Sequence, residues 1–228
     1  MSKIIVALDG FSSCGKSTTA KRVAAQLHYA FVDTGAMYRA VALYLHRNQI
    51  DIKDLQAVED ALKHIDIGFE FNPARQASDT LLNGENVEQE IRKMYISELV
   101  SQVAAITVVR RAMVAQQQKM GQKKGLVMDG RDIGTVVFPN AEVKIFMTAQ
   151  PHIRAQRRKL ELLQKGEDLP LEEIIENLRM RDEIDSNRAE GPLKRADDAI
   201  DLDTSFRSMD EQVDFVLAQV ERVQREKK

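Results

Sequence analysis

The sequence has little of what disulfides, membrane spans or strong charge fields require. Its one cysteine, Cys14, cannot form an internal disulfide, which fits a reducing cytosol. After Lys3 only five apolar residues precede Asp9, too few for a signal peptide or a membrane span. The net charge is −2, so no basic field suggests a nucleic acid partner. We therefore expect a cytoplasmic protein without nucleic acid or membrane partners.

What is present is the pattern of an α/β protein. The 228 residues suit one large domain or a core with small insertions. Five short apolar runs alternate with helical patterns, at residues 4–8, 31–32, 125–129, 143–147 and 199–202. This alternation predicts a parallel sheet in a three-layer α/β/α sandwich. No sustained exposed apolar stripe is evident, so we expect a monomer.

One stretch departs from that alternation. Residues 65–71 alternate between apolar and polar side chains, and Asn83 and Gly84 form a hairpin-type turn shortly after them. Residues 65–87 therefore predict a small antiparallel β insertion between the second and third core strands. Such an insertion could cover a phosphate acceptor.

Residues 10–17, Gly-Phe-Ser-Ser-Cys-Gly-Lys-Ser, follow the first strand and open a helical pattern at 17–27. The glycines let backbone N–H groups turn inward as an anion nest, and the positive end of the helix adds to that field. Lys16 can reach the β- and γ-phosphates, and the Ser17 hydroxyl can ligate Mg²⁺. A chance match is the alternative, but the strand before and the helix after favour a nucleoside triphosphate site.

Two more strands lead into polar residues. The second ends at residues 31–32 and is followed by Asp33, after which residues 34–35 predict a turn and 36–46 a helix that carries Arg39. The third ends at Asp129, whose carboxylate can hold the Mg²⁺ shell, and residues 130–135 follow with another acid and an arginine. Arg39 could instead be solvated, and residues 131–132 could be an ion pair in a turn. Their clustering at the strand ends favours function.

Arginines also gather after residue 151. Two successive helical patterns each carry a charged face, with Arg154, Arg157 and Arg158 in the first and Arg181, Asp185 and Arg188 in the second. Charged faces are usually solvated. Two arginine-bearing faces in a helical hairpin nevertheless predict a mobile lid, which would exclude water and place positive charge on a migrating phosphoryl group.

Taken together, these stretches resemble the bacterial cytidylate kinase family of nucleoside monophosphate kinases. The similarity lies at residues 10–17, 33–39, 101–105, 129–139 and 181–188, and the insertion fits it as well. The resemblance implies transfer of the γ-phosphate of ATP to CMP or dCMP, with Mg²⁺, in pyrimidine nucleotide metabolism. It further implies a P-loop core at 1–40, 100–150 and 190–228, a monophosphate-binding region at 41–99 and a helical lid at 151–189.

The resemblance also implies roles for individual residues. ATP would bind at Gly10, Ser12, Ser13, Cys14, Gly15, Lys16, Ser17, Thr18, Arg157 and Arg158, with Mg²⁺ at Ser17 and Asp129. The acceptor would bind at Thr34, Gly35, Tyr38, Arg39, Ser101, Arg110, Arg131, Asp132, Arg181, Asp185 and Arg188. The catalytic groups would be Lys16, Arg131, Arg157 and Arg188. Within the acceptor set, Ser101, Arg110 and Asp132 match the hydrogen-bonding edge of cytosine.

Several alternatives stay open. The acceptor could be shikimate or another nucleoside monophosphate, or the chain could be a nucleotide sensor without a second substrate or a plain interaction domain. The preference between CMP and dCMP and the tolerance of UMP are also open. The Cys14 thiol could have a lowered pKa among inward N–H groups, but an inert small residue is the interpretation we favour.

Overall fold

The computed structural model describes residues 2–72, 77–164 and 166–226. The chain forms two compact units. The first unit comprises Met1–Val32, Gly121–Asn187 and Gly191–Lys228, and the second comprises Asp33–Met120 and Arg188–Glu190. The functional regions expected from the sequence divide the chain differently and stay a prediction.

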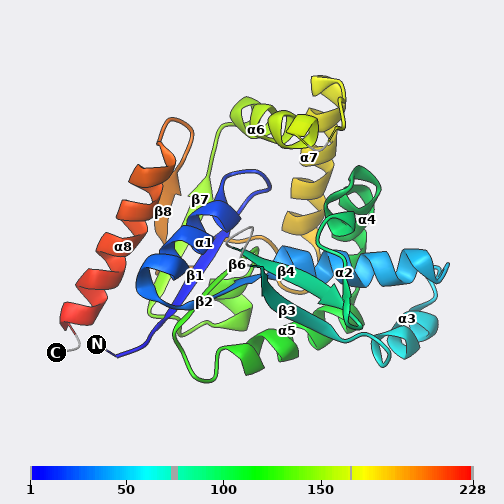
Figure 1. The fold of residues 1–228 in the computed structure, drawn as a ribbon, viewed down its shortest axis with the longest axis horizontal. Helices are drawn as coiled ribbons and strands as arrows, with labels where there is room; N and C mark the ends of the chain where they lie inside the picture. Colours follow the sequence, from blue (N-terminus) through cyan, green and yellow to red (C-terminus); the bar gives the residue numbers. More distant parts are fainter. Residues whose placement is uncertain (1, 73–76, 165, 227–228) are drawn as a thin grey trace. The chain divides into compact units, whose positions relative to one another are not determined.

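The first unit is built on a five-stranded sheet (Figure 1). Its strands, in the order β2-β6-β1-β7-β8, are β2 (Ala30–Asp33), β6 (Leu126–Gly130), β1 (Ile5–Gly10), β7 (Val143–Thr148) and β8 (Ile200–Asp203). The pairs β1–β6, β1–β7 and β7–β8 are parallel. Every strand that the apolar runs predict is present, and the α/β fold class is confirmed.

Helices α1 (Lys16–Leu27) and α8 (Met209–Glu226) cover one face of this sheet. Because side chains alternate along a strand, every second residue of β1 faces these helices. Val6 and Leu8 pack there with Val23 of α1 and Val216 of α8, all fully buried. This core holds the carboxyl end of β1 and the start of α1 in place.

The first unit also contains a helical hairpin. Helix α6 (Pro151–Gln164) packs on α7 (Leu171–Asn187) through a small core of its own. Leu162 and Ile174 lie at its centre. Arg154, Arg158, Arg181 and Asp185 are buried as well, so these charged faces are not the solvated faces that such patterns usually make. No helix of the described residues combines the length and hydropathy that a membrane span needs.

The second unit holds the predicted β insertion, a three-stranded antiparallel sheet. Its strands are β3 (Ile67–Asn72), β4 (Ala77–Leu82) and β5 (Glu85–Asn86). Asn83 and Gly84 connect the last two with positive φ at both residues, 52° and 83°. That is the turn geometry that an Asn-Gly pair favours in a tight hairpin.

The helices of this unit are α2 (Thr34–Arg47), α3 (Leu55–Leu62), the short η1 (Glu90–Arg92), α4 (Met94–Ala105) and α5 (Thr107–Met120). The prediction of a turn at residues 34–35 was wrong, because α2 already begins at Thr34. The reason is the side chain of Asp33, which accepts a hydrogen bond from the backbone N–H of Ala36 at 2.9 Å and so caps the helix two residues earlier.

Candidate active site

The loop between β1 and α1 has the backbone of an anion site. Gly15 lies just before α1 with φ 96°, and no side chain caps this helix end. The first N–H groups of α1 therefore keep their hydrogen-bonding capacity for an anion, at the positive end of the helix. The sequence had predicted this arrangement from residues 10–17.

Packing between strands also requires a glycine at position 10. Its φ is 146°, and a Cβ atom there would lie 2.0 Å from the backbone oxygen of Met147 in the neighbouring strand β7. Gly10 therefore lets two strands approach each other where the loop begins.

Lys16 lies across the loop rather than out in solvent. Its side-chain nitrogen donates a hydrogen bond to the backbone oxygen of Phe11 at 2.6 Å and lies 3.7 Å from the sulfur of Cys14. Only 5% of the residue is exposed, and burial lowers the pKa of Lys16 from its usual value. The ammonium group is thus held where a phosphate on the loop would meet it.

Ser17 and Asp129, the two residues predicted to hold Mg²⁺, are in contact. The Ser17 hydroxyl donates to Oδ2 of Asp129 at 2.8 Å, and Asp129 is 3% exposed. Both offer oxygen atoms, the ligand type that Mg²⁺ prefers. Within residues 2–72, 77–164 and 166–226, no group of three or more His, Cys, Asp or Glu could hold a metal ion. This donor set fits Mg²⁺, which usually takes one or two protein ligands beside phosphates and water.

The backbone after β6 is held by a buried carboxylate, Asp9, that is not among the predicted site residues. Asp9, at the end of β1, accepts hydrogen bonds from the backbone N–H groups of Ile133 and Gly134, both at 2.7 Å. Those residues open the π-helical turn η2 (Ile133–Val137), which starts directly after Asp132. Burial raises the pKa of Asp9 to about 6. Asp9 thereby sets the position of the chain that carries Asp132.

Arg131 joins the phosphate loop to the helical hairpin. Its Nε donates to Asp185 of α7 at 2.8 Å, and a terminal nitrogen donates to the Ser12 hydroxyl at 2.7 Å. Arg181 lies nearby and is 7% exposed. Burial and the charge of Arg131 lower the pKa of Arg181 to about 10. The site therefore concentrates positive charge that an anionic ligand would stabilise.

Arg154 makes a second such link, although its role was not predicted. Its guanidinium donates to Asp182 of α7 at 2.6 Å and to the Ser12 backbone oxygen at 3.3 Å, and it lies 5.2 Å from the ring centre of Phe11. The sequence placed Arg154 on one helix face with Arg157 and Arg158. Nothing in that spacing separates an arginine that holds the loop from one that contacts a ligand.

The two predicted lid arginines differ in their contacts. Arg157 donates to the hydroxyl and the backbone oxygen of Thr204, at 3.1 and 2.6 Å. The same Thr204 hydroxyl donates to the backbone oxygen of Cys14 at 2.8 Å, so this segment after β8 also borders the phosphate loop. Arg158 is 7% exposed and pairs with Glu161 at 2.8 Å. Thr204 belongs to no motif of the sequence, so its contacts could not be predicted.

Ser13 and Thr18 lie in the first unit with the phosphate loop, and seven predicted residues belong to the second unit, namely Thr34, Gly35, Tyr38, Arg39, Ser101, Arg110 and Arg188. Arg110 is 2% exposed and lies 5.6 Å from the ring centre of Tyr38, and Ser101 is equally buried. Arg39 lies beside Asp33. Burial alone would raise the pKa of Asp33, but the charges of Arg92 and Arg39 bring this pKa below its usual value.

The comparisons with known proteins agree with this geometry. The family model of cytidylate kinase matches residues 6–222. A cytidylate kinase from Cytophaga hutchinsonii is 54% identical over 217 residues, 95% of this chain and 93% of that protein. One from Bacteroides thetaiotaomicron is 52% identical and covers 99% of this chain and 100% of its own length. The chain belongs to the cytidylate kinase family.

Membership makes the chain a phosphotransferase of the nucleotide kinase type, as the sequence predicted. Among solved structures, an uncharacterized protein from Eubacterium ventriosum matches with a TM-score of 0.51 and 11% identity, and it covers 96% of this chain and 99% of that one. At that identity the likeness concerns the fold alone.

Proposed function

We propose that the chain transfers the γ-phosphate of ATP to CMP or dCMP, which gives ADP and CDP or dCDP. Two relatives that match nearly the full chain are named cytidylate kinase. The observation in the structure that supports the proposal best is the hydrogen bond from Arg131 to Ser12, at 2.7 Å. It brings an arginine assigned to the acceptor phosphate against the loop assigned to the donor.

The donor side relies on the phosphate loop. Backbone N–H groups at the start of α1 and the ammonium group of Lys16 bind the β- and γ-phosphates. Ser17 and Asp129 would hold Mg²⁺, which neutralises charge on the transferring phosphoryl group when bound. Arg157 and Arg158, on the α6–α7 hairpin, act as the lid arginines over ATP and help to exclude water.

The acceptor needs positioning more than activation. A phosphate oxygen of CMP is already a nucleophile, so no strong general base is required. Arg39, Arg131 and Arg188 bind this phosphate, since a dianion suits several guanidinium groups. Arg181 and Asp185 contact the sugar. Ser101 and Arg110 donate to acceptor atoms of cytosine, and Asp132 accepts from its amino group. Catalysis then comes from alignment and charge neutralisation.

The cytoplasmic location, the monomeric state and the absence of nucleic acid or membrane partners rest on the sequence composition alone. They stay predictions beside the enzymatic proposal.

The test is ADP release with Mg-ATP and a panel of acceptors, namely CMP, dCMP, UMP, AMP, GMP and shikimate. We expect turnover mainly with CMP and dCMP. Turnover with another acceptor would keep the kinase chemistry and overturn the cytosine-reading residues. ATP binding without any acceptor-dependent turnover would instead favour a nucleotide sensor.

A further inference from the structure

The β insertion contains none of the residues predicted to bind substrate, yet a buried polar chain begins on it. Thr80 of β4 donates two hydrogen bonds to Oε2 of Glu88, from its backbone N–H at 3.2 Å and from its hydroxyl at 2.8 Å. Thr80 is 1% exposed and Glu88 is 6% exposed. A carboxylate buried this deeply needs compensating partners, and the next one is an arginine.

That arginine, Arg92, bridges two carboxylates. Its Nε donates to Oε1 of Glu88 at 3.1 Å, and a terminal nitrogen donates to Oδ2 of Asp33 at 2.9 Å. The side chains of Asp33 and Glu88 are 9% and 8% exposed. The guanidinium of Arg92 therefore neutralises two buried carboxylates, Asp33 and Glu88, which lie 55 residues apart in the sequence. Removal of the cation would leave both anions without that compensation.

Asp33 connects this chain of contacts to Arg39. Its Oδ1 caps α2 through the N–H of Ala36 at 2.9 Å. A Cβ atom placed on Gly35 would lie 3.0 Å from that Oδ1 and 3.1 Å from a terminal nitrogen of Arg39. The carboxylate and the guanidinium therefore lie on the same side of Gly35, where a larger residue would press on both. The charge of Arg39 also contributes to the lowered pKa of Asp33, so the two groups interact electrostatically.

We propose that Arg92 is a positioning residue for the acceptor phosphate. Anchored to the β insertion through Glu88, it holds Asp33, and Asp33 in turn holds the start of α2 and the guanidinium of Arg39. The inference rests on the proposed function, in which Arg39 binds the phosphate of CMP. It gives the insertion a role in the grip on a nucleoside monophosphate, with no contact of its own to that ligand.

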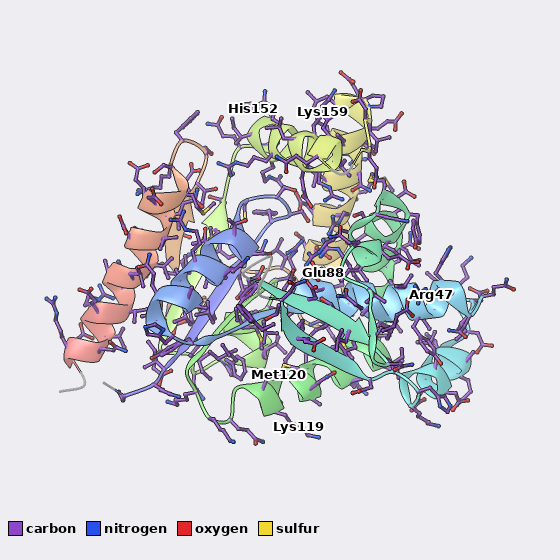
Figure 2. All side chains as sticks on the ribbon, in the orientation of Figure 1. Arg47, Glu88, Lys119, Met120, His152 and Lys159 are labelled. Atoms are coloured by element: carbon purple, nitrogen blue, oxygen red, sulfur yellow. The ribbon has the colours of Figure 1, made fainter. Side chains whose placement is uncertain are left out.

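The same unit offers a matched control. Arg47 lies at the C-terminal end of α2, where Figure 2 labels it, and it also bridges two glutamates. It donates to Glu85 at 2.7 and 2.9 Å and also to Glu90. Its side chain is 34% exposed, and that of Glu85 is 58% exposed. Substitution of Arg47 removes an arginine between two carboxylates but leaves the path from Glu88 to Asp33 intact.

The experiment compares R92M, R92K, R47M and R39M in steady-state kinetics with CMP and ATP. We expect R92M to raise the KM for CMP by about tenfold or more, since small misplacements of a binding group have effects of that size. The KM for ATP should change by less than about twofold in the same variant. R92K keeps the positive charge and should restore part of the loss. R47M should behave as the unmodified protein does.

A double variant, R39M with R92M, tests the path itself. If Arg92 acts through Arg39, the second substitution should add little to the first. Additive losses in the double variant would overturn the inference, as would equal changes in the KM for CMP and for ATP in R92M. An R92K variant whose KM for CMP equals that of R47M would also overturn it. The last comparison decides the question even if R92M fails to fold. If R39M leaves the KM for CMP unchanged, the acceptor role itself is wrong. If R39M raises the KM for CMP but neither R92M nor R92K does, only the positioning role of Arg92 is wrong.

Discussion

Replacement of Asp9 by asparagine should remove a pH-dependent part of the protein's stability. Asp9 is 5% exposed, and its two carboxylate oxygens each accept a backbone N–H. Burial raises its pKa from 3.8 to about 6. The folded protein therefore binds a proton at Asp9 more readily than the unfolded chain does. The contribution of Asp9 to the free energy of unfolding must then increase as the pH falls through 6 toward 4.

The size of this effect follows from the two pKa values. The complete shift of about two pKa units corresponds to about 3 kcal/mol. At pH 8 Asp9 is ionised in both states, so it adds no pH dependence there. At pH 5 the folded state is mostly protonated and the unfolded state mostly ionised, which is worth about 1.4 kcal/mol. The free energy of unfolding of the unmodified protein, minus that of D9N, should thus rise by about 1.4 kcal/mol from pH 8 to pH 5.

Urea unfolding at several pH values between 5 and 8 measures this difference, with D33N as the control. Asp33 is also buried, but Arg92 and Arg39 keep its pKa below the usual value. It is ionised in both states over this range, so the corresponding difference for D33N should stay nearly constant. A constant difference for D9N as well would refute the reasoning. It would mean that the two N–H bonds stabilise the ionised carboxylate more than burial destabilises it.

Three further variants test separate parts of the site. G10A should lower the free energy of unfolding by about 3 kcal/mol or more in a urea titration, because its Cβ would lie 2.0 Å from the backbone oxygen of Met147. Its control is G84A, which has a positive φ but no atom within 4 Å of the added Cβ and should cost about 1 kcal/mol. Equal losses in the two variants would contradict the packing argument. R131A should raise the KM for CMP far more than that for ATP, whereas equal changes would contradict its acceptor role. D132A should relax the preference for CMP over UMP in the ADP-release assay, and an unchanged preference would remove Asp132 from the base-reading set.

The fold was readable from the sequence because its signals are local. A buried parallel strand needs a continuous apolar run, and five such runs between helical patterns define the sheet. The Asn-Gly turn needs positive φ at both residues, so it marks the hairpin of the insertion. The phosphate loop is equally local, since its glycines, lysine and serine act through one strand end and one helix start. The strand ends pointed to Arg39, Asp129, Arg131 and Asp132, whereas the full set of ligand-binding residues is what the family resemblance implies.

The contacts that support those residues could not be read in the same way. The hydrogen bonds that Ile133 and Gly134 donate to Asp9, and that Arg131 donates to Ser12, join positions more than 100 residues apart. No spacing or periodicity encodes such a pair, because it exists only after the strands align in register. Even Gly10, which the motif includes, owes its necessity to a backbone atom of another strand.

The sequence by itself therefore determined the order of elements and the phosphate loop, since these depend on residues close together along the chain, and the resemblance to a kinase family, since each of its motifs is a short stretch. Tertiary structure alone decided which charged side chains are buried and what compensates them. Arg92 illustrates the difference. In the sequence it is one arginine outside every motif named above, and in the structure it is the cation between Glu88 and Asp33. The desolvation of a charge depends on everything packed around it, and that environment exists only in the folded chain.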